Sequence, residues 1–484
     1  MDATGPNADL LFPSDAHSLS LAREIYGNLA SLPILSAHTH VEAAVLERNE
    51  PFAGPADLLV TPDHYLLRVL HASGVDLSSL GRRERGGERE DRAHAGGRTG
   101  EPAESGGREI WRVLCRNWPV FRGTNSRLWL ELELAGLFGV TDPLTEATAD
   151  STYDRIASAL AEDDYRPRAL YERFGIEVLA TTDGALDALT SHGTLAADPH
   201  FEGRVIPTFR PDNVLDATRD DFASNVADLG RHHDLDTDGW QGYCEAIRME
   251  RERFIAHGAV ASDHGPGLPD TIDLSEHEAE RLFADVLGGS ATEADRTKLT
   301  AHLLFKMAEL SCDDGLVMQL HAGVLRDHDG AAHARFGSDI GADFPVGVSF
   351  TRGLRPLLER FGSDPRFTLV VYSVDETAFA RELAPMASYY PALRLGAPWW
   401  YLDAPDAITR ALSQMAEVAG FSRAAGFVDD ARSFCSIPAR HEVARRVTAA
   451  FLARLVAEHR LSLQEATDTG VDLSYLLPKS TFGL

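Results

Sequence analysis

The sequence predicts an α/β protein built as a closed (β/α)8 TIM barrel, on three observations. Eight short apolar or β-rich runs follow one another along the 484 residues. Helical patterns lie between most of these runs, and strands that alternate with helices are typical of parallel βα units. Polar residues gather at the carboxyl ends of the runs, where such a barrel carries its active site. A doubly wound sheet with a few extra strands is the alternative.

The predicted strands are short, and each ends in polar residues. In chain order the runs cover residues 32–40, 176–183, 204–212, 258–265, 315–323, 367–375, 393–401 and 426–434. Two of the intervening helical patterns are especially clear, at 352–362 and 406–420. Apolar residues recur there at helical spacing, and Gly362 or Gly420 ends each pattern.

The gap between the first and second runs is long and contains helical patterns at 63–76 and 125–139. We therefore expect a barrel formed by residues 1–45 and 170–484, and a mostly helical insertion at 46–169. Within the insertion, residues 81–109 are rich in glycine and in charges of both signs. A segment of this composition buries little surface, so we predict a flexible loop and assign it no function.

Charge and composition exclude several classes of protein. The formal net charge of −28 disfavours nucleic-acid binding, which needs a basic surface. No apolar run is long enough to span a bilayer, and the acidic N-terminus lacks the pattern of a signal peptide. The four cysteines lie far apart without a C-x-x-C motif, which fits reduced thiols. We expect a cytoplasmic protein without a nucleic-acid or membrane partner.

A pair of histidines, His38 and His40, lies at the end of the first run. In an extended segment residues two apart point the same way, as two imidazole ligands of one metal ion must. Asp430 in the last run is a candidate third ligand, because the eighth strand of a closed barrel lies beside the first. The alternative is a pair of hydrogen-bonded histidines at a strand end.

Asp430 and Arg432 are also two apart, and form either a plain ion pair or a base beside an anion anchor. Asp429 points the other way and is expected to be structural. Farther back, His64 and Arg68 share one face of the helix predicted at 63–76. That face either meets a polar substrate or is solvated.

Other motifs narrow the chemistry. His321 ends the fifth run, Arg326 lies just beyond it, and Asp339 and Asp343 follow among glycines. The stretch DHDG lacks the remaining ligands of an EF-hand. The motifs of nucleotide-binding loops and of serine esterases are missing as well.

An ordered series of motifs resembles one known family. From about residue 20 to the C-terminus it reads HTH, DHYLLR, WLELEL, ATTD, IPTFRPD, SDHG, VMQLHAGVLR, FGSDIGADF, GAPWW and DDARSFCSIPARHEVARRV. Order and spacing together resemble the uronate isomerases (glucuronate/galacturonate isomerases) of the amidohydrolase superfamily. The resemblance implies a TIM barrel of the amidohydrolase type.

The resemblance also implies an activity and its ligands. Such an isomerase interconverts D-glucuronate and D-fructuronate, or D-galacturonate and D-tagaturonate, by moving a proton between C2 and C1 through an enediol. The substrate is a small-molecule uronate, the cofactor is a divalent metal with zinc expected, and no organic cofactor is needed. A homo-oligomer is possible.

Roles carry over to the positions that match the family's motifs. His38 and His40 match the metal pair, and Asp430 matches an aspartate that contacts the metal and shuttles the proton. The catalytic set is then Asp430, His64 and Tyr65. The substrate-binding set is Arg432, Arg210, Trp400, Arg68 and His321.

Three departures mark a divergent member of that family. Ser36 stands where the family usually has an aspartate, so a carboxylate beside the metal ligands is lost. The second run continues as TTDGALD instead of with an acid and a proline, and Glu131 aligns with a family histidine. The substrate can therefore differ as well.

Two alternatives to the isomerase stay open. A metal-dependent hydrolase of a small polar substrate could use the same barrel and the same residues to activate water. The fourth run ends in SDHG, without the lysine, cysteine or glutamate that often bridges a second metal in such enzymes. The other alternative is a sugar-acid binder that has lost its metal, which Ser36 slightly supports.

Overall fold

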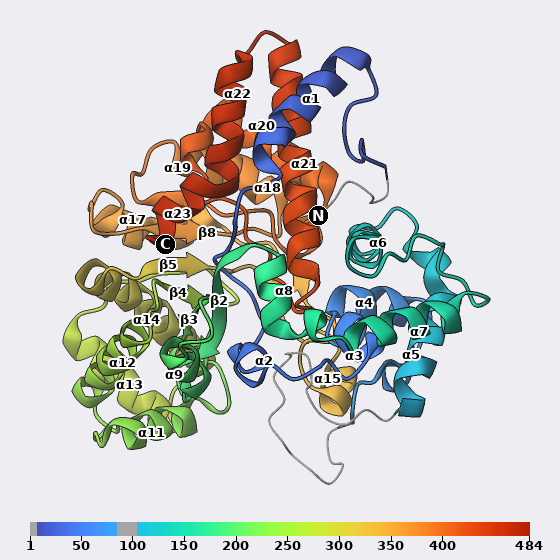
Figure 1. The fold of residues 1–484 in the computed structure, drawn as a ribbon. Helices are drawn as coiled ribbons and strands as arrows, with labels where there is room; N and C mark the ends of the chain where they lie inside the picture. The colour runs from blue at the N-terminus through green and yellow to red at the C-terminus, as the bar shows by residue number, and fades with distance from the viewer. Residues whose placement is uncertain (1–6, 85–103) are drawn as a thin grey trace.

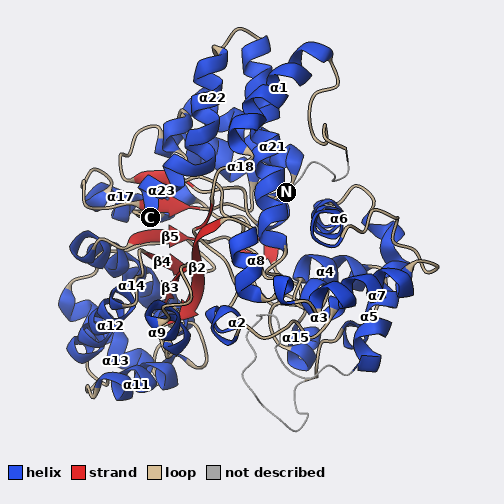
Figure 2. Ribbon diagram, viewed as in Figure 1, coloured by secondary structure: helices blue, strands red, loops and turns tan. Residues whose placement is uncertain are grey.

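The computed structural model describes residues 7–84 and 104–484. Within these residues the chain forms an α/β fold in which helices surround a curled parallel sheet (Figures 1 and 2). Most of the loop predicted at 81–109 lies outside the described residues, so its flexibility stays a prediction.

Seven parallel strands form the main sheet, in the order β1-β2-β3-β4-β5-β8-β9. They are β1 (Ile34–Ser36), β2 (Ile176–Gly184), β3 (Arg204–Arg210), β4 (Ala261–His264), β5 (Val317–Leu320), β8 (Leu369–Val371) and β9 (Leu393–Leu395). Each matches one of the first seven predicted runs, with β2 one residue longer than its run, which confirms those strands and their parallel arrangement. The carboxyl ends of neighbouring strands therefore meet at one edge of the sheet.

The eighth predicted strand is wrong. Residues 426–434 are all described, and none of them belongs to a strand. The extended conformation is interrupted twice in this segment, at Gly426, whose φ is 93°, and at Asp430, whose φ is 45°. A residue in the left-handed region cannot continue a pleated ladder, so the segment is irregular where the pattern predicted regular pairing.

This irregular segment still lies between the two edges of the curled sheet. The amide of Ala425 donates to the carbonyl oxygen of Leu395 in β9 at 2.8 Å. At its other end, the amide of His40 donates to the carbonyl oxygen of Ala431 at 2.9 Å. Single hydrogen bonds, and not a ladder, bring the last run beside the first.

Helices cover the outside of the sheet, and the two clearest predicted helices are confirmed as α17 and α20. α20 has a proline in its first turn, where a missing N–H costs nothing, and ends before Gly420. The helices between β2 and the C-terminal region are α9 (Thr190–Ala197), α10 (Asp212–Leu215), α11 (Phe222–His233), α12 (Trp240–Ala256), α13 (Glu276–Leu287), α14 (Glu293–Asp314), α15 (Gly330–Phe336), α16 (Phe350–Gly353), α17 (Arg355–Phe361), α18 (Glu376–Ala378), α19 (Ala384–Ala387) and α20 (Pro405–Val418).

Between β1 and β2 the described residues form helices and no strand. These are α2 (Ala43–Arg48), α3 (Pro55–Leu59), α4 (His64–Ala72), α5 (Glu104–Asn117), α6 (Asn125–Phe138), α7 (Ala149–Leu160) and α8 (Pro167–Arg173). α3 to α7 gather to one side of the sheet (Figure 1). The side chain of Asp63 accepts a hydrogen bond from the amide of Tyr65 at 2.8 Å, so it caps α4.

The two ends of the chain pack together. α1 (Ala16–Leu29) lies against α21 (Ser436–Ala457) and α22 (Leu463–Val471), and the chain ends in α23 (Leu477–Phe482) (Figure 1). α21 begins shortly after the irregular segment and is buried along most of its length. It therefore supports the segment that carries Asp430.

A second, two-stranded sheet was not expected from the sequence. β6 (Val324–Leu325) pairs antiparallel with β7 (Phe344–Pro345). All four cysteines are free thiols. No helix among the described residues is both long enough and apolar enough to cross a membrane.

Candidate active site and metal centre

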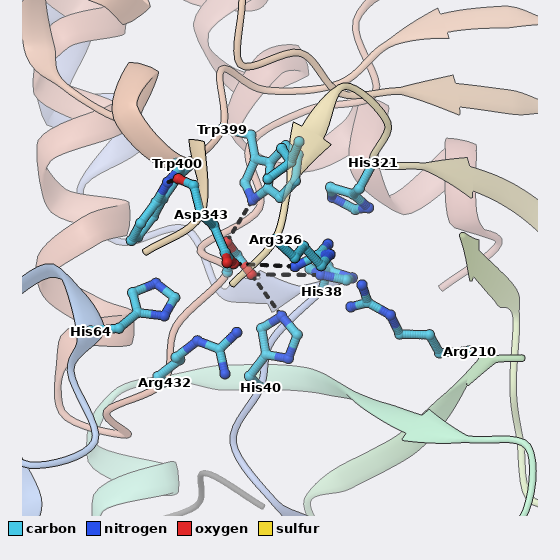
Figure 3. Close-up of a pocket in the computed structure, with 12 residues that line it drawn as sticks. His38, His40, His64, Arg210, His321, Arg326, Asp343, Trp399, Trp400 and Arg432 are labelled. Atoms are coloured by element: carbon cyan, nitrogen blue, oxygen red, sulfur yellow. Dashed lines mark hydrogen bonds and ion pairs between the residues drawn. The ribbon is translucent and has the colours of Figure 1, made fainter. Parts of the chain in front are cut away.

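A cavity opens where the carboxyl ends of the strands meet (Figure 3). About 400 Å³ of it is free of atoms, its open mouth included. Eight of its lining residues were predicted to be site residues: His38, His40, His64, Arg210, His321, Trp400, Asp430 and Arg432. The other lining residues are Val324, Arg326, Asp343 and Trp399.

The three predicted metal ligands lie together. Nε2 of His40 is 3.0 Å and Nε2 of His38 is 3.6 Å from Oδ1 of Asp430. Yet this buried Oδ1 accepts no well-aligned hydrogen bond from the described residues. Burial lowers the pKa of His38 to about 3, so its ring is neutral and offers a lone pair. Two neutral nitrogens and a carboxylate oxygen that converge in this way suit a divalent metal ion.

Asp430 is held on its other side by Trp399. The indole N–H donates to Oδ2 of Asp430 at 3.0 Å, which leaves Oδ1 toward the two histidines. Burial alone would raise the pKa of Asp430, but the contact with His40 at 3.0 Å and the positive charge of Arg432 outweigh it and hold the pKa well below its usual value. The carboxylate is therefore ionised at neutral pH, as a base or a metal ligand must be.

A second chain of contacts runs along the cavity wall. Nδ1 of His321 lies 2.6 Å from Oδ1 of the fully buried Asp263, and Nη1 of Arg210 lies 3.2 Å from its Oδ2. Nε2 of His321 is buried and has no hydrogen-bond partner among the described residues. Its ring stacks between His38 and Tyr372, with centroids 4.7 and 4.1 Å away. The Asp263 contact thus leaves Nε2 of His321 free to act as an acceptor.

Arg432 does not pair with Asp430. Its Nη2 contacts Oδ1 of Asp339 at 2.9 Å instead, so this guanidinium already has a carboxylate partner, and its role as an anion anchor stays a prediction. His64 lines the cavity beside Trp400, with ring centroids 4.3 Å apart. Burial, followed by the charge of Arg432, lowers the pKa of His64 well below its usual value.

Two predicted residues lie behind the cavity wall and do not line it. The ring of Tyr65 is 1% exposed and packs edge-on against Trp400 and Trp129. The guanidinium of Arg68 lies over the rings of Tyr401 and Trp400, 4.6 and 5.5 Å from their centroids. Both support the wall, and their direct roles stay predictions.

The departures seen in the sequence have local consequences. The hydroxyl of Ser36 and Nδ1 of His38 are both buried, and neither has a hydrogen-bond partner among the described residues. No carboxylate therefore orients the His38 ring from this side. Asp429 points away, with Oδ2 3.2 Å from Nε2 of His441. Glu131 forms an ion pair with Arg127 at 2.7 Å, outside the cavity.

Sequence reasoning assigned no role to several residues that shape the site. Asp263 and Trp399 each end a predicted strand, which was the signal available for them. Arg326 directly follows β6 and Asp343 directly precedes β7, and no pattern predicted that this two-stranded sheet would lie at the cavity.

Comparison with known proteins identifies the family of the chain. The model of the glucuronate isomerase family matches residues 16–482. The chain belongs to the glucuronate isomerase family. A relative named uronate isomerase from Corynebacterium efficiens is 45% identical over 98% of this chain and 98% of its own length.

Solved structures of the glucuronate isomerase family share the fold. Glucuronate isomerase from Caulobacter crescentus aligns with a TM-score of 0.93 at 42% identity, covering 99% of this chain and 97% of that one. Uronate isomerase from Thermotoga maritima aligns with a TM-score of 0.88 at 25% identity, over 98% and 99% of the two chains. The resemblance inferred from the ordered motifs is therefore confirmed.

Proposed function

We propose that this protein is a uronate isomerase, an aldose–ketose isomerase of sugar acids. One observation carries the proposal: in a chain of the glucuronate isomerase family, His38, His40 and Asp430 converge in a cavity that guanidinium groups also line. The substrates we propose are D-glucuronate, giving D-fructuronate, and D-galacturonate, giving D-tagaturonate.

His38, His40 and Asp430 would hold a divalent metal, and we propose zinc. The donor set fits, because neutral imidazole nitrogens and one carboxylate oxygen are ligands that zinc accepts. When bound, the metal would act as a Lewis acid that polarises the oxygens of the substrate. No organic cofactor is needed for this chemistry.

Asp430 would carry the proton of the isomerisation. Its carboxylate takes the proton from C2, and the electron pair of the broken C–H bond forms the double bond of the enediol. The proton of the O2 hydroxyl moves to O1, a transfer we assign to His64. The O2 carbonyl then forms as Asp430 returns its proton to C1. Arg432, Arg210 and Trp400 would bind the substrate around these atoms.

A hydrolase is the less favoured alternative. The relative and the solved structures described above are named as isomerases, and the residues after β4 are Gly265 and Pro266, with no bridging lysine, cysteine or glutamate at the end of that strand. The remaining expectations stay predictions: a cytoplasmic location, no nucleic-acid or membrane partner, and a possible homo-oligomer.

We also propose the finer organisation of the fold. Residues 1–45 and 170–484 would form a barrel of the amidohydrolase type, which residues 424–431 would close through their bonds to β9 and to the chain just after β1. Residues 46–169 would be a helical insertion. Its support is the run of helices without a described strand between β1 and β2.

The activity is tested by NMR. Purified protein is incubated with D-glucuronate and, separately, with D-galacturonate, after chelation and again after zinc is restored. We expect ketose signals from at least one sugar acid with zinc present and none after chelation. Absence of ketose from both substrates in the zinc-loaded protein would contradict the proposal and favour the hydrolase.

A further inference from the structure

Three aromatic rings stack in a row beside the candidate metal centre. The ring of His321 lies between those of His38 and Tyr372, with centroids 4.7 Å from His38 and 4.1 Å from Tyr372. The planes of His321 and Tyr372 differ by only 5°, and those of His321 and His38 by 29°. All three side chains are buried. The stack therefore leads from the residue that follows β8 to one of the predicted metal ligands.

His38 lacks the hydrogen bond that usually orients a metal-binding histidine. Such a histidine donates from its second ring nitrogen to a carboxylate, a carbonyl group or water, and this bond fixes the ring. Nε2 of His38 faces Oδ1 of Asp430, but its Nδ1 is buried without a hydrogen-bond partner among the described residues. Ser36, two residues earlier, supplies no carboxylate. The orientation of the His38 ring must therefore come from the rings that pack against it, His40 edge-on at 5.3 Å and His321 face-on.

Tyr372 is held firmly enough to fix the plane of its neighbour. Its hydroxyl donates to Oε1 of Gln319 in β5 at 2.8 Å, and both side chains are fully buried. A Cβ atom on Gly396 would overlap the Tyr372 ring, so the ring lies directly against the glycine backbone. His321 is bound to Asp263 at Nδ1 alone, and a single hydrogen bond leaves a ring able to pivot about it. The flat contact with Tyr372 prevents that motion on one face of His321.

We propose that Tyr372 is a positioning residue of the metal centre: its ring fixes the plane of His321, and through His321 it keeps Nε2 of His38 directed at the metal. This inference rests on the proposed function and adds a residue that does not line the cavity. The stack would take the place of the missing hydrogen bond at Nδ1 of His38. Ordinary core packing is the alternative, and it would make Tyr372 important for stability alone.

The zinc dissociation constant of the full chain tests the inference. It is measured by competition with a chromophoric chelator, and His40→Asn shows how much zinc is bound elsewhere. We expect about 10- to 100-fold weaker zinc binding in Tyr372→Leu, the range for loss of a group that orients a metal ligand. Tyr372→Phe keeps the stacked ring, so its zinc binding should stay within about threefold of wild type. Its melting midpoint should nevertheless fall, because Oε1 of Gln319 loses its donor.

Tyr243 in α12 provides the matched control. It is also buried, its hydroxyl donates to the carbonyl oxygen of Val214 at 2.8 Å, and its ring packs 4.8 Å from that of Phe283. Tyr243→Leu should lower the melting midpoint of the metal-free protein as Tyr372→Leu does, but change zinc binding by less than about twofold. Cobalt(II) in place of zinc gives a second readout, since its visible absorption depends on ligand geometry. The absorption should change in Tyr372→Leu and not in Tyr243→Leu.

Tyr372→Met fills more of the space of the ring and should show the same loss of zinc binding, which covers the case of a leucine variant that does not fold. Zinc binding within about threefold of wild type in either variant would overturn the inference, and so would equal weakening in Tyr243→Leu or in Tyr372→Phe. Weakened zinc binding in Tyr372→Leu, in a protein that isomerises no uronate, would contradict the proposed function alone. Isomerisation by the wild-type protein together with normal zinc binding in Tyr372→Leu would contradict this inference alone.

Discussion

Arg440 donates from Nη1 to the backbone carbonyl oxygen of Asp430 at 3.1 Å, and the same nitrogen also contacts the carbonyl oxygen of Asp429. The bond supports a left-handed backbone, since φ of Asp430 is 45°, a conformation that non-glycine residues seldom adopt outside special sites. The buried guanidinium also lies 4.1 Å from the ring centroid of Trp129. Helix α21 thereby determines where the carboxylate of Asp430 points.

Replacement of Arg440 should affect catalysis more than folding. In Arg440→Lys the charge stays, but the compact ammonium lacks the planar guanidinium, which lies over the ring of Trp129 while its Nη1 bonds the two carbonyl groups. We expect kcat to fall by at least about 10-fold and the melting midpoint to fall by only a few degrees. Arg445→Lys is the matched control, because Arg445 lies on the same helix and bonds to the carbonyl oxygens of Leu32 and Pro33. An equal loss of kcat in both variants would contradict the prediction.

The indole of Trp399 should orient Asp430. Trp399→Phe keeps most of the ring and removes the N–H donor to Oδ2, so we expect kcat to fall about 10-fold while KM stays within about twofold. Trp400→Phe is the control, since the indole of Trp400 donates to the backbone carbonyl oxygen of Asp343 at 2.9 Å. Steady-state kinetics should show that Trp400→Phe acts mainly on KM. The same effect of both variants on kcat would rule out a specific role of Trp399.

The assignment of His38, His40 and Asp430 as metal ligands can be tested by zinc content as well as by activity. Asp430→Asn should abolish turnover and keep a near-normal melting midpoint, and His40→Asn should lower the zinc content measured by mass spectrometry. The control is His232→Asn. His232, His233 and Glu250 form another cluster, but Arg253 already contacts both oxygens of Glu250. We expect unchanged zinc content in this variant, and equal zinc loss in both histidine variants would contradict the assignment.

The stability of the protein should depend on pH through Asp183. Burial raises the pKa of this carboxyl from 3.8 to about 7, against a hydrogen bond from Thr181 that lowers it. The folded state therefore keeps a proton that the unfolded state has lost, and stability falls as pH rises from about 4 to about 7. Asp183→Asn lacks this penalty. Its free energy of unfolding should match that of wild type near pH 4 and exceed it by about 1 to 3 kcal/mol at pH 8, and its melting midpoint should change in the same direction.

Asp198→Asn gives the opposite sign and serves as the control for Asp183. Hydrogen bonds from the amide of His200 and from Arg168 hold the pKa of Asp198 below its usual value. Its carboxylate stabilises the fold above about pH 4, so the asparagine variant should lose stability at neutral pH and approach wild type in acid. If the gain of Asp183→Asn at pH 8 persists unchanged at pH 4, the titration of Asp183 is not its cause.

The regular parts of the fold could be predicted because strand and helix patterns are local. The runs that contain His38, Arg210 and His321 all formed strands, and α17 and α20 formed where apolar spacing placed them. The prediction of a strand in the last run, residues 426–434, was wrong for a reason that local sequence patterns do not show. This run is apolar enough to be a strand, but its conformation depends on Arg440, which bonds to its carbonyl groups from the following helix.

The candidate site also has residues that could be predicted from the sequence and residues that could not. His38, His40 and Asp430 were predictable because spacing and strand order place them together, and the structure brings them within contact. Arg326 reaches the cavity through two-residue strands, which are too short to leave a period in the sequence. Tyr65 was placed in the catalytic set because its motif matched, although its ring packs behind the cavity wall.

The contacts between the first and last runs also set the order in which the protein becomes competent during synthesis. Thr39 bonds to Ala431 across 392 positions of the chain, and β1 to β9 are complete by residue 395. A ribosome-bound chain can therefore contain every strand of the main sheet while its metal pair still lacks Asp430. The site is complete only when α21 has emerged, so a chain that stops before Arg440 would hold all seven parallel strands without the helix that supports Asp430.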